Sequence, residues 1–312
     1  MTSFAFVFPG QGSQSVGMLD AWGDHPAVRQ TLEEASAALG ADIGALIHAG
    51  PKEQLDLTTN TQPVMLTAGI ACYRAWMTET DLAPAIVAGH SLGEYSALVA
   101  AGALTLADAL PLVRFRARAM QEAVPAGVGA MAAILGMDAN AVRDGCAKVA
   151  GATGEVVEAV NFNDPKQTVI AGSKAGVEKA CEALKSAGAK RALLLPVSAP
   201  FHSSLMKPAA ERLKERLAAT AIAAPAIPVI NNIDVAVNAD PAAIREALYR
   251  QAFGAVRWAE TVLAMRSRGV THVIECGPGK VLAGMVKRID PQAQSGAVYD
   301  PATLAETRGL LG

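Results

Sequence analysis

The feature of this sequence that most constrains its fold is a segment in which a strand, a sharp turn and a helix must follow one another. Residues 85–88 are apolar and lead into Gly89-His90-Ser91-Leu92-Gly93, and residues 94–103 have helix-forming composition without proline. Glycine lets such a turn close without a Cβ clash, and the following helix N-terminus directs N–H groups toward a developing oxyanion. An ordinary turn is the alternative, but the flanking strand and helix favour Ser91 as a nucleophile.

Short apolar runs alternate with helical segments along the rest of the chain. Strands are predicted over residues 4–8, 85–88, 130–135, 168–171, 192–197, 228–231 and 272–276. This alternation predicts an α/β fold with a mainly parallel sheet. Residues 129–197 have an order of their own, strand-helix-strand-strand-helix-strand, which fits a ferredoxin-like α+β unit. We therefore predict a large, discontinuous α/β-hydrolase-like domain over 1–128 and 198–312, with a small ferredoxin-like subdomain inserted over 129–197. The tail from about residue 291 is weakly patterned and is expected to add little to the site.

Composition excludes several classes of protein. Of 312 residues, 51% are hydrophobic and 18% charged, which argues against disorder, and no apolar run is long enough to span a bilayer. The first residues lack the basic region of a secretory signal, so we expect a cytoplasmic protein. The four cysteines lie far apart and form no C-x-x-C, which favours reduced, buried thiols over zinc ligands or disulfides.

The charge is close to balanced overall but unevenly distributed. The formal net charge is −2, which gives no basic footprint for nucleic-acid binding. Residues 1–110 hold 3 basic and 11 acidic side chains, and residues 111–312 hold 24 basic and 18 acidic ones. The basic C-terminal part could attract an acidic partner or a phosphate-bearing ligand, and a solvated surface is the alternative.

A serine nucleophile needs a base, and His202 is the best candidate among five histidines. It follows a predicted strand on a proline-bent loop, where catalytic groups are common. His90 is adjacent to Ser91 and is expected to point away from it. The other three stand in loop-like or strand surroundings: His25, His48 and His272.

A helix from about residue 105 to 123 carries an arginine on its apolar face. The positions three, four and seven residues from Arg116 on either side are all apolar, whereas Arg118 neighbours polar residues. An inward guanidinium needs an anion, and its fork suits a carboxylate. A structural ion pair and a substrate carboxylate are both open at this point.

Two glycine-containing loops resemble nucleotide-binding sequences but lack their full patterns. In residues 8–14 the G-x-G-x-x-G pattern fails at Ser15, and no P-loop follows, so no nucleotide cofactor is expected. The N–H groups of this loop could instead form half of an oxyanion hole. Residues 277–280 are interpreted as a turn before a C-terminal helix.

These motifs together resemble the malonyl-CoA:acyl carrier protein transacylase family and, more broadly, the acyltransferase domains of polyketide synthases. The resemblance runs nearly end to end and rests on residues 8–14, 89–95, 120–125, 161–163, His202, 231–232 and 277–280. It implies that Ser91 is acylated, with His202 as its base, and that Arg116 binds the malonyl carboxylate. It also implies an oxyanion hole from the N–H groups of Gln11 and Leu92, and a main-chain carbonyl near Gln251 that orients the histidine. The implied pocket includes Phe201, Met120, His90 and Asn161, with the ring of Phe201 favouring malonyl over methylmalonyl.

The implied activity is ping-pong transfer of malonyl from malonyl-CoA to the phosphopantetheine thiol of acyl carrier protein. The resemblance implies no cofactor or metal, an acidic carrier protein as partner and a monomeric enzyme. A basic surface at Lys190, Arg191, Lys207, Lys287 and Arg288 is the candidate docking site. Two alternatives remain: a patatin-like serine hydrolase, whose nucleophile pairs with an aspartate, and a non-enzymatic carrier-protein binder. The sequence leaves open whether fatty-acid or polyketide synthesis is served.

Overall fold

A five-stranded parallel sheet forms the centre of the larger body in the computed structural model, which describes residues 3–125, 127–197 and 199–312. The strand order is β7-β2-β1-β8-β9, with bounds Val229–Ile230, Ile86–Gly89, Phe4–Phe8, His272–Cys276 and Gln294–Val298. All neighbouring strands run parallel. The predicted α/β class with a mainly parallel sheet is confirmed.

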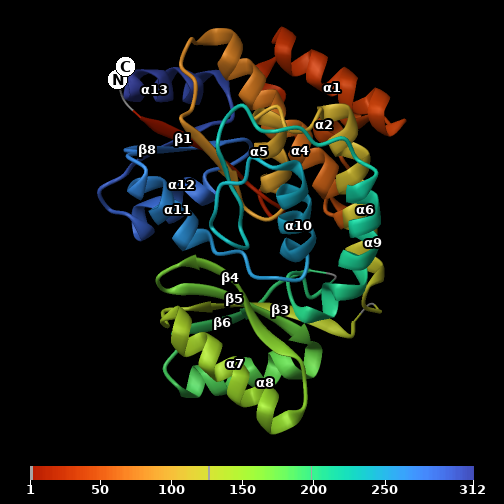
Figure 1. Ribbon diagram of the computed structural model, residues 1–312, viewed down its shortest axis with the longest axis vertical. Coiled ribbons are helices and arrows are strands. Elements are labelled where there is room, and N and C mark those ends of the chain that lie inside the picture. Colours follow the sequence, from red (N-terminus) through yellow and green to blue (C-terminus); the bar gives the residue numbers. More distant parts are fainter. Residues whose placement is uncertain (1–2, 126, 198) are drawn as a thin grey trace.

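The central strand β1 shows why this sheet is buried on both faces. Phe4, Phe6 and Phe8 point into one hydrophobic core, and Ala5 and Val7 point into the other. A strand covered by helices on both sides has this continuously apolar composition. In Figure 1, α4, α5, α6, α9 and α10 lie to the right of the sheet, and α11 and α12 lie to its left.

The helices of the larger body have the following bounds: α1 Pro26–Leu39, α2 Ile43–Ala49, α3 Lys52–Leu55, α4 Thr58–Glu79, α5 Gly93–Ala100, α6 Leu106–Glu122, α9 Lys207–Ala218, α10 Pro241–Gln251, α11 Trp258–Ser267, α12 Val281–Ile289 and α13 Pro301–Leu311. Thr105 caps α6, since its side chain accepts the N–H of Asp108. The weakly patterned tail after residue 291 contains two elements that were not predicted: β9, which extends the parallel sheet, and α13, which packs on β9.

A second, antiparallel sheet forms the smaller body in the lower part of Figure 1. Its order is β4-β5-β3-β6, with bounds Val157–Asp164, Gln167–Ser173, Gly129–Leu135 and Arg191–Leu194. Helices α7 (Ala139–Thr153) and α8 (Lys174–Ser186) pack with it around a separate hydrophobic core. Strand β4 had no clear signal in the sequence, because its pairing is irregular and its buried and partly buried residues do not alternate.

The chain order in this body is that of a ferredoxin-like unit, and its assignment as an inserted subdomain over 129–197 stays a prediction. Residue 198, where the prediction resumes the large domain, lies outside the described residues. No helix within the described ranges is long and apolar enough to cross a membrane.

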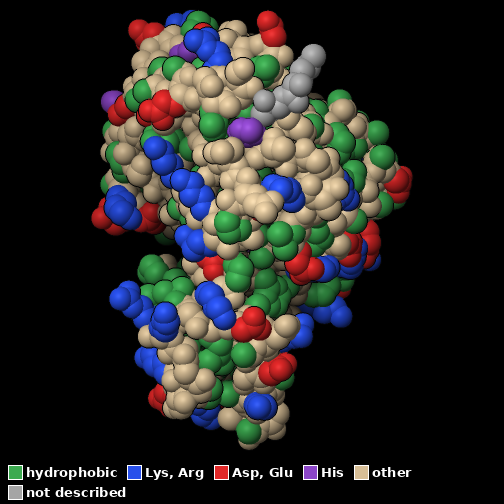
Figure 2. All heavy atoms as spheres, turned by 90° about the vertical axis from the view of Figure 1, so that its left-hand side faces the viewer, with side chains coloured by type: hydrophobic (Ala, Val, Ile, Leu, Met, Phe, Trp, Pro, Cys, Tyr) green, Lys and Arg blue, Asp and Glu red, His purple; other side chains and the backbone are tan. Residues whose placement is uncertain are grey.

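Strand β4 joins the two bodies. The Phe162 N–H donates to the Val256 carbonyl (2.9 Å), and the Val256 N–H donates to the Val160 carbonyl (2.8 Å). Arg288 of α12 adds an ion pair to the buried Asp164, with Nε 2.6 Å from Oδ2. Figure 2 shows Lys and Arg side chains on both sides of a notch between the bodies.

Candidate active site

The turn between β2 and α5 holds Ser91 in a strained conformation. Its φ is 52°, in the left-handed region that a residue with a Cβ rarely adopts. A Cβ on Gly89 would lie 1.8 Å from the carbonyl carbon of Gly93, and one on Gly93 would lie 2.1 Å from the Phe8 carbonyl oxygen. Both glycines are therefore needed for the turn to pack against β1.

The imidazole of His202 meets the hydroxyl of Ser91, with Nε2 2.6 Å from Oγ. On its other side, Nδ1 lies 2.9 Å from the main-chain carbonyl oxygen of Gln251. Because a carbonyl only accepts, Nδ1 carries the hydrogen and Nε2 is free to take a proton from the serine. Burial and the charge of Arg116 lower the pKa of His202 to about 3, so the ring is neutral at physiological pH.

Arg116 reaches this pair from the inner face of α6 and is 1% exposed, so the predicted inward orientation is confirmed. Its Nη1 donates to Gln62 Oε1 (2.9 Å), and its Nη2 to Gln251 Oε1 (3.1 Å) and Ser91 Oγ (3.3 Å). These acceptors are uncharged, and the buried Nε has no partner among the described residues. Burial lowers the pKa of Arg116, whose guanidinium nevertheless stays protonated at neutral pH. The side chain thus presents a cation beside the serine, and all of its hydrogen-bond partners are neutral.

A cavity of about 120 Å³ opens above the serine. Nine of the ten residues assigned to the site from the sequence line it: Gln11, His90, Ser91, Leu92, Arg116, Met120, Asn161, Phe201 and His202. The tenth, Gln251, lies beneath the site and contacts it through hydrogen bonds. Four further lining residues were missed: Gln62, Met131, Leu195 and Val197. They come from α4, β3 and the segment after β6, and only the tertiary structure brings these together.

His90 points away from Ser91, as expected. Its Nε2 lies 2.8 Å from Asn163 Oδ1, and its ring packs edge-on to Trp258. Burial lowers the pKa of His90, so it too is neutral. Asn161, which also lines the cavity, can accept a further hydrogen bond, because its buried Oδ1 has no hydrogen-bond partner in the described part of the chain.

The other residues singled out in the sequence lie outside the site. His25 caps α1, His48 contacts Asp20 on the surface, and His272 contacts Thr271. The four cysteines are free and buried. Residues 277–280 form the turn before α12, as predicted.

A set of buried polar side chains supports the nucleophile, and the hydrogen bonds that connect them were not predicted from the sequence. Asn232 Oδ1 accepts the Ser91 N–H (2.8 Å), and its Nδ2 donates to the Gly89 carbonyl (2.7 Å). Glu94 Oε2 accepts the Asn232 N–H (2.9 Å) and Gln251 Nε2 (3.0 Å). Burial raises the pKa of Glu94 to about 7, and these two N–H donors oppose the rise. Gln251 was named from the sequence only for orienting the histidine, and Glu94 and Asn232 belong to the matched motifs at 89–95 and 231–232 without a role assigned to them.

Comparison with known proteins shows similarity along nearly the whole chain. Residues 5–304 match the acyl transferase domain family. A malonyl CoA-acyl carrier protein transacylase of Escherichia coli (strain K12) is 53% identical over 306 residues, covering 98% of each chain. The acyl-carrier-protein S-malonyltransferase of Burkholderia pseudomallei 1710b has a TM-score of 0.96 at 66% identity, over 98% of this chain and 99% of that one. A malonyl-transacylase solved with a type II PKS acyl-carrier protein has a TM-score of 0.95 at 49% identity, over 97% and 98% of the two chains.

Proposed function

The chain belongs to the acyl transferase family and is an acyltransferase, and on this premise we propose that it transfers malonyl from malonyl-CoA to the phosphopantetheine thiol of an acyl carrier protein. The observation that carries this proposal is the buried guanidinium of Arg116, 3.3 Å from Ser91 Oγ. A cation in this position binds an acyl group that ends in a carboxylate while the serine attacks its thioester. Relatives named for the same reaction, at 53% identity over the full chain, support it.

The first half-reaction acylates Ser91. His202 Nε2 takes the hydroxyl proton, and Oγ attacks the thioester carbonyl to form a tetrahedral intermediate. The N–H groups of Gln11 and Leu92, which both line the cavity, stabilise its oxyanion. When the intermediate collapses, the carbon–sulfur bond breaks, the CoA sulfur takes the proton from His202, and a malonyl-serine ester remains.

The second half-reaction reverses these steps with a different thiol. The phosphopantetheine thiol gives its proton to His202 and attacks the ester carbonyl, and Ser91 recovers a proton as the carbon–oxygen bond breaks. Because CoA leaves before the carrier-protein thiol reacts, and Ser91 holds the malonyl group in between, the kinetics are ping-pong. The low pKa of His202 keeps the ring in its basic form in both halves.

The choice of acyl group depends on two side chains that line the cavity from different elements. Arg116 selects a terminal carboxylate, and the ring of Phe201, just before His202, crowds a substituent on the α-carbon. One methyl group is worth about 1–3 kcal/mol of discrimination, so Phe201 sets a preference rather than an absolute barrier.

A second cavity of about 650 Å³ shares Gln11, His90 and Asn161 with the first and continues between α12 and the segment after β6. It provides a route for the phosphopantetheine arm. The basic residues predicted to dock an acidic carrier protein are all exposed: Lys190, Arg191, Lys207, Lys287 and Arg288. Reversing the charge of Lys190 and Arg191 should raise the carrier-protein KM at low salt, and an unchanged KM would remove this docking surface. The monomeric state and cytoplasmic location stay predictions from the sequence.

The decisive experiment is intact-mass measurement after brief incubation with malonyl-CoA. Wild type should gain one malonyl group that Ser91→Ala does not gain, and addition of holo carrier protein should remove it.

The hydrolase alternative predicts hydrolysis of neutral esters that is insensitive to Arg116→Ala. Its nucleophile–aspartate pairing also differs from the serine–histidine–carbonyl arrangement seen here. Carrier-protein binding with no adduct would instead support the non-enzymatic alternative.

A further inference from the structure

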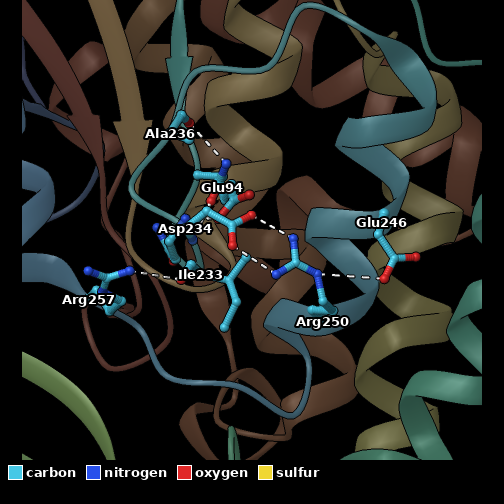
Figure 3. Close-up of polar contacts among 9 residues, drawn as sticks. Glu94, Ile233, Asp234, Ala236, Glu246, Arg250 and Arg257 are labelled. Atoms are coloured by element: carbon cyan, nitrogen blue, oxygen red, sulfur yellow. Dashed lines mark hydrogen bonds and ion pairs between the residues drawn. The ribbon is translucent and has the colours of Figure 1, made fainter.

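Glu94 is a buried carboxylate to which the proposed reaction gives no chemical step. It is 2% exposed and stands in the first turn of α5, three residues after the nucleophile. Figure 3 shows Glu94 next to Asp234, a residue of the loop between β7 and α10. A carboxylate in such a position is costly to bury unless donors meet it, and Oε2 receives two of them, from Asn232 and Gln251.

Each of these two donors belongs to a residue that holds a different part of the site. The side chain of Asn232 bonds to both Gly89 and Ser91 and so fixes the two sides of the nucleophile turn. Gln251 fixes the other side of the reaction, because its carbonyl orients His202. Glu94 therefore joins the support of the nucleophile to the support of the base.

The side chain of Gln251 extends this connection to the carboxylate-binding group. Its Nε2 donates one hydrogen to the Ser91 carbonyl (2.9 Å) and the other to Glu94 Oε2 (3.0 Å). With both amide hydrogens taken by acceptors, Oε1 is turned toward Arg116 Nη2, 3.1 Å away. In the reversed amide orientation an N–H would face the guanidinium, and this hydrogen bond would be lost.

A second, more exposed contact links helix α10 to the loop between β7 and α10, and it does not reach the site. Arg250 of α10 donates to both carboxylate oxygens of Asp234 (2.8 and 2.6 Å), as Figure 3 shows. Attachment of the loop to α10 therefore does not depend on Glu94. What Glu94 adds is the orientation of the Gln251 amide and of the Asn232 backbone.

We propose that Glu94 is a positioning residue of the transfer reaction. Its acceptor oxygen aligns Gln251 and Asn232, and these two residues in turn hold the Arg116 guanidinium and the turn at Ser91 in their relative positions. The inference rests on the proposed malonyl transfer. Loss of the acceptor should slow acylation by any acyl-CoA through the turn. It should slow acylation by malonyl-CoA further, because the Arg116 guanidinium, which binds the malonyl carboxylate, is then also held less firmly by Gln251.

The test compares Glu94→Met with Glu94→Gln, using acylation rates with malonyl-CoA and with acetyl-CoA. Methionine keeps the length of the side chain without a comparable acceptor, whereas glutamine retains one oxygen that can accept both N–H groups. We expect Glu94→Met to lower the malonyl-to-acetyl rate ratio at least fivefold and Glu94→Gln to keep it within twofold of wild type. A wild-type ratio in Glu94→Met would overturn the proposal, and so would a Glu94→Gln variant as impaired as Glu94→Met.

Glu275 offers a matched control for loss of a buried carboxylate. It is fully buried in β8, accepts the Ala283 N–H (2.9 Å), and burial raises its pKa to about 7, like that of Glu94. Glu275→Met should lower the melting temperature and leave the malonyl-to-acetyl ratio unchanged. An equal change of ratio in both methionine variants would assign the effect to general destabilisation and refute the positioning role. Failure of the proposed function is distinguished separately, because wild type would then form no malonyl adduct.

Discussion

Replacing Arg116 by methionine should remove the enzyme's preference for malonyl while leaving its ability to acylate Ser91. Methionine fills much of the same buried space without a charge, so the change isolates the contact with the substrate carboxylate. The guanidinium has an unpartnered Nε and meets only neutral oxygens through its other nitrogens. Two of its N–H groups can therefore turn to a carboxylate without breaking an ion pair.

The size of the effect follows from burial. Truncating one partner of a buried, hydrogen-bonded charge pair costs about 2–5 kcal/mol, and at roughly 1.4 kcal/mol per tenfold this lowers kcat/KM for malonyl-CoA by about 30- to 4,000-fold. Acetyl-CoA has no carboxylate to lose. Its kcat/KM should change by less than about tenfold, through the weaker contact of Nη2 with Ser91 Oγ at 3.3 Å.

The assay is acylation by each acyl-CoA under single-turnover conditions, followed by intact mass in wild type, Arg116→Met and Arg116→Lys. Lysine restores the charge but not the two-pronged geometry, so it should recover only part of the malonyl rate. Equal losses for malonyl-CoA and acetyl-CoA would refute the reasoning, because Arg116 would then act on the nucleophile rather than on the carboxylate.

Three other outcomes follow from the structure. The pKa of the His202 imidazole, measured by NMR, should be about 3, far below 6.5. It should rise in Arg116→Met, because a nearby positive charge is removed. A midpoint near 6.5 in both proteins would contradict the burial of His202 beside Arg116. Gly89→Ala should lose at least about 4 kcal/mol of unfolding free energy, measured in urea, because its new Cβ would meet backbone atoms. Gly151→Ala, which has open space around it in α7, should gain about 0.5–1 kcal/mol. Similar urea midpoints for the two variants would show that the turn can relax. Phe201→Ala should raise the methylmalonyl-to-malonyl ratio of kcat/KM about tenfold, measured by competition, and an unchanged ratio would remove Phe201 from acyl selection.

Local patterns predicted the parts of the site that depend on one element at a time. The turn at Ser91 follows from glycines whose Cβ atoms the neighbouring backbone would exclude. The inward direction of Arg116 follows from the 3.6-residue period of α6, and the structure places it 1% exposed. For His202 the sequence showed a loop after a strand, and the resemblance supplied its pairing with Ser91.

Patterns failed where pairing is irregular or short. Strand β4 alternates poorly between apolar and polar residues and carries register shifts, so its sequence does not have the two-residue period of a regular strand. Strand β9 includes exposed and half-buried residues at a sheet edge, so its sequence carries only a weak strand pattern.

What the sequence by itself determined is the set of reactive groups and the element that carries each, because turn sterics and helical periodicity act within a few residues. Only the tertiary structure decided how these groups meet. Ser91 and His202 are 111 positions apart, and Gln251 is 160 positions from the serine whose carbonyl it binds. The buried hydrogen bonds of Glu94, Asn232 and Gln251 join elements that no local pattern relates, because each donor finds its acceptor only after the sheet and its helices have packed.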